Sequence, residues 1–218
     1  MDATPKTAVV TTVAIDLAKD VFELAFADAD ARIIERSRLS RSALAKALAN
    51  RAPLRVIMEA CGSAHGWARH FQPIGHDVEL LPAHAVRPYV HGKTDRTDTA
   101  GLLEAARCAS IRRAPIKTPD KQGIQGLHRV REFHKAQRTA AINVLRGLLR
   151  EFGVVILIGS AKVRPAVLAA LEDADNDLPM ALRETLNGVL ATIAACEREM
   201  QAIENRLQAF AERDLRSQ

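Results

Sequence analysis

The sequence is poor in aromatic residues and in cysteine. Aromatic side chains make up 4% of its 218 residues, whereas apolar residues of all kinds make up 48%, so a folded core must consist mainly of alanine, valine, leucine and isoleucine. The three cysteines, Cys61, Cys108 and Cys196, are far apart and odd in number, which fits neither a disulfide framework nor a cysteine-based metal site. We therefore expect free thiols in a reducing cytoplasm.

Long apolar runs are also missing. The longest purely apolar stretches, residues 154–158 and 166–171, are far shorter than the roughly 20 residues that a membrane-spanning helix needs. The N-terminus lacks the apolar core of a secretion signal. These absences predict a cytoplasmic protein that has no membrane partner.

Charge is distributed unevenly along the chain. Residues 1–106 hold 13 basic and 13 acidic side chains, residues 107–150 hold 11 and 2, and residues 151–218 hold 7 and 11. A solvated helix normally mixes both signs, so the one-sided middle segment predicts a surface that binds a polyanion, with a merely solvated face as the alternative. The candidate nucleic-acid-binding residues of this segment are Arg112, Arg113, Arg129, Arg131, Lys135, Arg138, Arg146 and Arg150.

The first half of the chain alternates between short apolar strands and helices. A helix is expected after Ser40 or Ser42, a second one after Ser63, and a third from Asp95 onward. Three early strands followed by alternating helix and strand predict an α/β domain over residues 8–115, in which helices cover both faces of a mixed sheet. The expected strands are residues 11–16, 21–26, 32–39, 54–58 and 76–81.

From about residue 119 the pattern becomes helical. We expect a long basic helix over residues 126–151, an interruption over 152–177, and a last helix capped by Asp177 with Pro179 in its first turn. Spacings of four and three residues then alternate along a heptad seam, which predicts an all-α hairpin or coiled coil over residues 119–215. The partner of the seam is either the basic helix of the same chain or a second copy. The seam consists of Leu182, Leu186, Val189, Ile193, Cys196, Met200, Ile203, Leu207 and Phe210.

The stretch HGKTDRTDTA, residues 91–100, places Asp95 and Asp98 three residues apart where a helix is expected to begin. One interpretation is local: Asp95 caps the helix, and Asp98 interacts favourably with the helix dipole. The other is that both belong to a metal site with Asp16 and Glu59, which end the first and fourth strands, where ligands gather in open α/β sheets. A strand-end acid also often starts a turn or pairs with an arginine. Four carboxylates suit the two divalent ions that phosphodiester chemistry can use.

Three stretches that contain these acids carry a family resemblance. AIDLAKD, IMEACGSAHGW and LLPAHAVRPYVHGKTDRTDTAGLLEAA resemble the three blocks of the DEDD-type transposases of the insertion-sequence one-ten family, which are similar to the Piv invertase. The resemblance covers roughly residues 8–215, and its most specific part is the Lys-x-Asp-x-x-Asp block. It implies a metal-binding domain of the RuvC fold, within the ribonuclease H class. It also implies a catalytic tetrad that holds Mg²⁺ or Mn²⁺, with two ions expected, and a basic residue, Lys93, beside the last pair. The tetrad is Asp16, Glu59, Asp95 and Asp98.

The same resemblance implies a function and partners. A transposase of an insertion sequence cleaves and rejoins DNA strands with the help of Mg²⁺. The family's long helices form a coiled coil, so a homodimer or a higher oligomer is expected. Several members are guided by a structured RNA that pairs with donor and target DNA. We expect much of that RNA or DNA contact in residues 107–150.

The chain departs from the family pattern at its C-terminus. Family members have a further C-terminal domain in which a serine acts as the nucleophile, and no serine here lies in a motif that matches it. Ser160 and Ser217 are expected in a loop and in the tail. We therefore expect a fragment, a truncated gene product or one part of an enzyme whose other part is separate, and no strand exchange by this polypeptide alone.

Two other functions stay open. The chain could be a non-catalytic remnant that binds nucleic acid and dimerises, or an autonomous RuvC-like nuclease specific for branched structures, which needs no serine. The first strand also resembles that of sugar kinases and chaperone-type ATPases. That function is disfavoured because no glycine-rich phosphate loop follows the strand.

Overall fold

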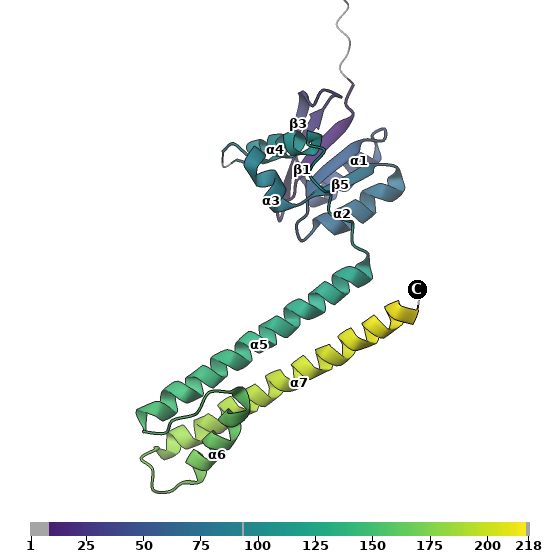
Figure 1. Ribbon diagram of the computed structural model, residues 1–218. Helices are drawn as coiled ribbons and strands as arrows, with labels where there is room; N and C mark the ends of the chain where they lie inside the picture. The colour runs from purple at the N-terminus through teal and green to yellow at the C-terminus, as the bar shows by residue number, and fades with distance from the viewer. Residues whose placement is uncertain (1–8, 93, 217–218) are drawn as a thin grey trace, which may run out of the picture. The chain divides into compact units, whose positions relative to one another are not determined.

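A computed structural model describes residues 9–92 and 94–216 (Figure 1). The chain divides into two compact units, residues 1–118 and 119–218. No helix within the described residues is both long enough and apolar enough to cross a membrane.

The first unit is built on a five-stranded mixed sheet. Its strands are β1 (Thr12–Asp16), β2 (Val21–Ala27), β3 (Ile33–Ser40), β4 (Arg55–Glu59) and β5 (Asp77–Leu81), in the order β3-β2-β1-β4-β5. β1 is antiparallel to β2, and β2 to β3, whereas β4 is parallel to both β1 and β5. The predicted mixed sheet is confirmed, and each expected strand lies within two residues of an observed one.

Helices cover both faces of this sheet, as predicted. On one face, α1 (Arg41–Ala49) and α2 (Ala64–Phe71) share a core with the large side chains of β1, β2 and β4. On the other, α3 (Ala83–Val86) and α4 (Asp95–Arg107) pack over smaller side chains such as Ala14 and Ala25. The helices of the first face give the sheet its thick core, and the small residues of the second face let α4 lie close to the central strands.

The segment before α4 also approaches that helix closely. Two short 3₁₀ turns, η1 (Gln72–Ile74) and η2 (Arg87–Tyr89), lie in this unit, and η2 precedes α4. A Cβ atom on Gly101 would lie 2.7 Å from Val90 Cγ2 and 3.0 Å from the Tyr89 carbonyl oxygen. Only glycine leaves room for this contact between α4 and the segment before it.

The second unit is a helical hairpin. It contains α5 (Pro119–Glu151), the short turn η3 (Ser160–Lys162), α6 (Val163–Glu172) and α7 (Met180–Arg216). α5 and α7 run antiparallel (Figure 1). Two ion pairs show the direction: Arg131 pairs with Glu204, and Arg138, seven residues further along α5, pairs with Glu197, seven residues further back along α7. The predicted all-α hairpin is confirmed.

The apolar seam of α7 packs against the basic helix of the same chain. Leu145 and Leu149 of α5 are fully buried and share a core with Leu186 and Ile193 of α7 and with residues of α6. The sequence left open whether the seam packs against the basic helix of the same chain or against a second copy, and in the structure it packs against the helix of the same chain. Burying Leu-sized side chains contributes about 1.5–3 kcal/mol each, which makes this core the main source of stability in the hairpin.

The helix boundaries of the second unit differ from the expected ones. α5 begins at Pro119, seven residues earlier than expected, since proline suits the first helical position. α6 lies inside the stretch that was expected to interrupt the helices. α7 begins at Met180, and the carbonyl of Pro179 accepts from the N–H of Leu182 and Arg183, so Pro179 precedes the first turn and Asp177 is too early to cap it.

Candidate metal centre

The strands bring Asp16 and Glu59 to the same edge of the sheet. β1 and β4 are parallel neighbours in which Ile15 lies opposite Met58, and Asp16 and Glu59 are the next residues of each strand. Both are the last residues of their strands and are partly buried. The carboxyl ends of parallel strands are where ligands collect in such sheets.

A capping box fixes the start of α4 and leaves both of its aspartates available. Thr94 Oγ1 accepts from the Thr97 backbone N–H at 3.4 Å, and Thr97 Oγ1 accepts from the Thr94 backbone N–H at 3.1 Å. Thr94 is therefore the N-cap, and the expectation that Asp95 caps the helix is wrong: Asp95 is the first helical residue. Because a threonine pair satisfies the helix end, neither Asp95 nor Asp98 is needed as a cap.

Three of the four predicted acids come together at this point. One carboxylate oxygen from each of Asp16, Asp95 and Asp98 lies within 4.8 Å of the others. Asp16 and Asp98 are partly buried, and Asp95 is exposed. A strand end and a helix start that are about 80 residues apart in the sequence thus present three hard oxygen donors to one point, as a divalent cation requires.

The electrostatics link all four acids. Burial, followed by the charges of Asp98, Asp95, Glu59 and Glu23, raises the pKa of Asp16 to about 6. The pKa of Glu59 is raised by burial and by Asp98, and that of Asp98 by burial and by Asp95. Carboxylates this close repel one another, and a bound cation would relieve the repulsion.

Glu59 differs from the other three in its geometry. The close group contains Asp16, Asp95 and Asp98, while Glu59 interacts with it through charge: Glu59 raises the pKa of Asp16 after burial and the two aspartates, and its own pKa is raised by burial and by Asp98. Its role as a metal ligand stays a prediction.

One further carboxylate, Glu23, was missed by the sequence reasoning. Glu23 on β2 is the cross-strand partner of Asp16, and only 9% of it is exposed. Its nearest cation is Arg36 of β3, with Nη1 at 4.0 Å. A signal was present in the sequence, because Glu23 is the only charged residue in the otherwise apolar strand VFELAFA.

The predicted basic residues of the first unit have different surroundings. Lys93 lies outside the described residues. Arg112 is exposed. Arg113 donates to Glu79 at 2.6 Å and to the Ala106 carbonyl at 2.7 Å, so its charge is already compensated inside the fold.

In the hairpin, several predicted nucleic-acid contacts have acidic partners. Arg131 pairs with Glu204 at 2.7 Å, Arg138 with Glu197 at 3.6 Å, and Lys135 with Glu132 at 3.2 Å. Their nucleic-acid binding stays a prediction, but their charge is partly compensated within the hairpin.

The remaining candidates of α5 have other environments. Arg146 donates to the carbonyls of Leu157 and Gly159. Arg129 and Arg150 are exposed. Arg112 and Lys135 are exposed as well, although Lys135 pairs with Glu132.

Fold and carboxylates together define a class of protein. A five-stranded mixed sheet with helices on both faces, acids at the end of its central strand and more acids at the start of α4 is consistent with the RuvC-like fold. A family model described as a transposase, that of the DEDD transposases of IS110 type, matches residues 13–154, more than half of the chain. The chain belongs to this family.

Curated relatives agree with the assignment. The chain is 36% identical over 211 residues to a Pseudomonas aeruginosa protein named "Probable family 20 transposase", covering 94% of the chain and 62% of the relative. It is 32% identical over 198 residues to the transposase for insertion sequence element IS1111A of Coxiella burnetii, covering 90% and 54%. A third relative, the transposase for insertion sequence element IS1328 of Yersinia enterocolitica, is 35% identical over 156 residues, covering 71% and 47%. The chain thus spans about half to three fifths of the length of these relatives.

Proposed function

We propose that this chain supplies the metal-binding part of a DNA transposase that cleaves and rejoins DNA strands. The observation that carries the proposal is the convergence on one point of Asp16, from the end of β1, with Asp95 and Asp98, from the start of α4. The donors are all carboxylate oxygens, and burial together with their mutual repulsion raises the pKa of Asp16. A hard divalent cation would relieve that repulsion and accept these oxygens as ligands.

In this proposal the residues of the chain have distinct tasks. Asp16, held rigidly at the end of the central strand, is the ligand common to the site, and Asp95 and Asp98 close it from the first turn of α4. Glu59 completes the tetrad from the neighbouring strand. Mg²⁺ or Mn²⁺ bound there, as two ions, would polarise the scissile phosphate and stabilise the charge that develops during cleavage.

The wider assembly is also part of the proposal. DNA is the substrate, and a structured guide RNA is expected to bind the basic side chains of residues 107–150. Arg112, Arg129 and Arg150, which are exposed, are the best placed of these to reach it. A cytoplasmic location is part of the same proposal.

A homodimer or higher oligomer would need a surface other than the α7 seam. That seam is used by α5 of the same chain. The outer face of α5 exposes Val130, Phe133 and Val144, which are 47%, 57% and 50% exposed and follow helical spacing. A second copy would dock there.

Metal binding is tested by thermal unfolding of the chain with Mg²⁺, with Mn²⁺ or with a chelator. A ligand present at 100 times its Kd stabilises the folded state by about 2.7 kcal/mol. We expect Mg²⁺ to raise the unfolding temperature of the wild-type chain and to leave that of Asp16→Asn unchanged. Asp30→Asn, which removes an exposed acid from the turn before β3, is the matched control and should respond as the wild type does.

Thermal unfolding and a DNA cleavage assay together separate the competing functions. A non-catalytic remnant predicts no response to Mg²⁺ in any of the three proteins. An equal response in Asp16→Asn and Asp30→Asn would contradict the proposed centre. An autonomous nuclease predicts cleavage of branched DNA by the chain alone, and that cleavage would be lost in Asp16→Asn.

A further inference from the structure

A row of charged side chains crosses the sheet beside the metal centre. Asp16 on β1 lies opposite Glu23 on β2, and Glu23 lies opposite Arg38 on β3. Cross-strand partners point to the same face of a sheet, so all three lie on the face that α4 covers. Arg36, two residues before Arg38, lies on this face as well. The row passes from anionic at the centre of the sheet to cationic at its edge.

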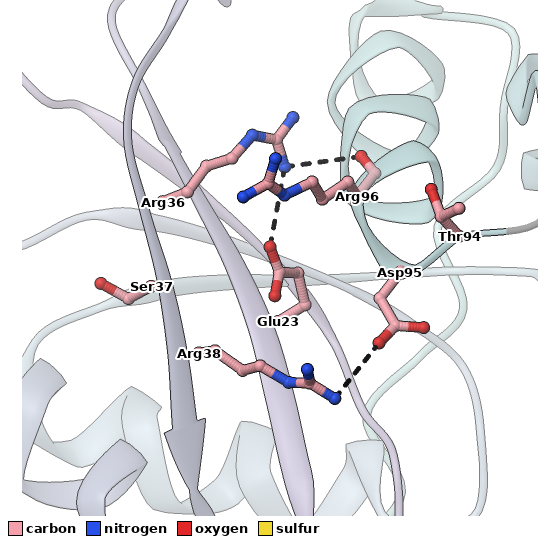
Figure 2. Close-up of a pocket in the computed structure, with 7 residues that line it drawn as sticks. All are labelled: Glu23, Arg36, Ser37, Arg38, Thr94, Asp95 and Arg96. Carbon is pink, nitrogen blue, oxygen red and sulfur yellow. Dashed lines mark hydrogen bonds and ion pairs between the residues drawn. The ribbon is translucent and has the colours of Figure 1, made fainter.

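A cavity of about 280 Å³ opens at the cationic end of this row (Figure 2). It shares Asp95 with the metal centre, so the two are contiguous. Its wall contains three arginines, two from β3 and one from the first turn of α4. The lining residues are Glu23, Arg36, Ser37, Arg38, Thr94, Asp95 and Arg96.

Arg36 is held in place. Its Nη1 donates to Thr99 Oγ1 at 3.0 Å and to the Arg96 carbonyl oxygen at 3.4 Å, and lies 4.0 Å from Glu23. Thr99 is a residue of α4 and is fully buried. This guanidinium therefore joins β3 to the start of α4 and provides a fixed positive charge at the base of the cavity.

Arg38 has a weaker partner. Its Nη2 lies 3.9 Å from Asp95 Oδ2, and the two side chains are 69% and 61% exposed. That separation is longer than a hydrogen bond, and exposed pairs of this kind contribute little to stability. Arg38 can exchange Asp95 for another anion at little cost. Figure 2 shows Arg38 extending from β3 towards Asp95, at the start of α4.

We propose that this cavity binds a phosphate of the DNA strand, next to the phosphate held at the metal centre, and that Arg38 and Arg96 contact it. Arg36 is the positioning residue. The inference rests on the proposed function, because it takes the cleaved strand as the ligand. Guanidinium groups bind phosphate oxygens through paired N–H donors, which gives geometric specificity as well as attraction.

Metal and strand binding are coupled through Asp95. In the metal-free protein Asp95 holds Arg38, and once Asp95 binds a cation, Arg38 is released to bind the phosphate. Two divalent ions added to the five carboxylates and three arginines around the centre give a net positive charge, which attracts the DNA backbone. The cavity adjoins the cutting centre, so we assign it to the substrate DNA and not to a guide RNA.

The test compares Arg38→Gln with Arg32→Gln in the full 218-residue chain. Arg32 is also exposed and directly precedes β3, about 20 Å from Arg38 at the usual rise per strand residue. The probe is a fluorescein-labelled single-stranded DNA hexamer, with an RNA hexamer of the same sequence beside it. Fluorescence anisotropy gives the Kd with Mg²⁺ and with a chelator over a range of salt concentrations.

We expect the wild type and Arg32→Gln to bind the DNA hexamer more tightly with Mg²⁺ than with the chelator. Arg38→Gln should weaken binding in Mg²⁺ roughly tenfold, as expected for the loss of one charged hydrogen-bonded contact. It should lower the slope of log K against log salt by about 0.7, the value for one phosphate contact on a single strand. Its thermal response to Mg²⁺ should persist, which shows that the fold and the metal centre are intact.

Three results would overturn the inference. One is an affinity of Arg38→Gln for DNA that equals that of Arg32→Gln, another is a wild-type chain that does not bind the DNA hexamer, and the third is a loss confined to the RNA hexamer. If any of these results occurs while Mg²⁺ still stabilises the wild type, only the proposal that the cavity binds phosphate is contradicted. Loss of the Mg²⁺ response in the wild type would instead remove the proposed metal centre.

Discussion

The charge cluster along the hairpin and the charge cluster at the metal centre differ in how their charges are compensated. In the hairpin, arginines of α5 face glutamates of α7, as in Arg131–Glu204 and Arg138–Glu197. In the first unit, Asp16, Asp95 and Asp98 approach one another instead. Opposite charges placed together add modestly to stability, whereas like charges placed together lower it.

This difference separates structural charge from functional charge. A fold does not gain by crowding carboxylates, so the crowding in the first unit supports the proposed cation, which would offset the repulsion. The hairpin carries nearly as many charged side chains as the first unit, and several of them are compensated within the hairpin. The density of charge in a sequence therefore identifies a binding site less well than the absence of compensation in the structure.

The largest effect is expected from the hairpin core. Leu145→Ala removes a fully buried side chain of α5 and should lower the free energy of unfolding by about 2–5 kcal/mol. Gln137→Ala, at an exposed position of the same helix, is the control and should change it by under about 0.5 kcal/mol. Urea unfolding followed by circular dichroism measures both.

If the two units are separate in function, Leu145→Ala should not change the affinity for Mg²⁺ under conditions in which the protein remains folded. Calorimetric titration with Mg²⁺ tests this. A lower Mg²⁺ affinity in folded Leu145→Ala would show that the hairpin takes part in building the metal centre. The two units would then not be separate in function.

A smaller effect of opposite sign is expected at the metal centre. In the presence of a chelator at neutral pH, Asp16→Asn should raise the free energy of unfolding by about 1–2 kcal/mol, because it removes a repelled and partly buried charge. The same substitution abolishes stabilisation by Mg²⁺. A residue whose removal stabilises the empty protein and eliminates ligand binding is one that the fold retains for function.

The pH dependence has a defined sign. The pKa of Asp16 is raised from 3.8 to about 6 in the folded protein, so the folded state binds this proton more tightly than the unfolded chain does. The stability that protonation gives is fully present below about pH 3.8 and is lost as the pH rises through about 6. The gap between Asp16→Asn and the wild type, measured by urea unfolding with a chelator, should therefore widen from pH 4.5 to pH 7. A gap that is constant with pH would mean that Asp16 does not titrate in this range.

Much of the fold was predictable from local patterns. Apolar runs located the five strands, and the heptad spacing located α7. The four acids were grouped because strand ends and helix starts have defined places in α/β sheets. The approach of Asp16 to Asp95 and Asp98 follows once α4 packs over the face of β1 that carries Ala14, two residues before Asp16.

What escaped prediction depends on contacts across the sheet and across the hairpin. Glu23 and Arg38 join the site through antiparallel pairing of β1, β2 and β3, and a sequence does not state that register. The cap of α4 was assigned to Asp95 because aspartate is a good cap, yet Thr94 with Thr97 forms a reciprocal pair. The acidic partners of Arg131 and Arg138 are 73 and 59 residues away in the sequence. Charge counted within residues 107–150 alone therefore overstates how much positive charge is left without an acidic partner.

The smallest effect tests that compensation directly. Glu204→Gln removes the main partner of Arg131 and should lower the free energy of unfolding only slightly, because the pair is near the surface. Glu199→Gln changes the net charge equally at another exposed site of α7 and serves as the control. If Arg131 is withheld from nucleic acid by Glu204, then Glu204→Gln should strengthen DNA binding more than Glu199→Gln does, with a salt slope steeper by about 0.9, as for one added contact to duplex DNA. An equal gain in both variants would mean that net charge alone sets the affinity, and that pairing across the hairpin does not determine which arginines are available to nucleic acid.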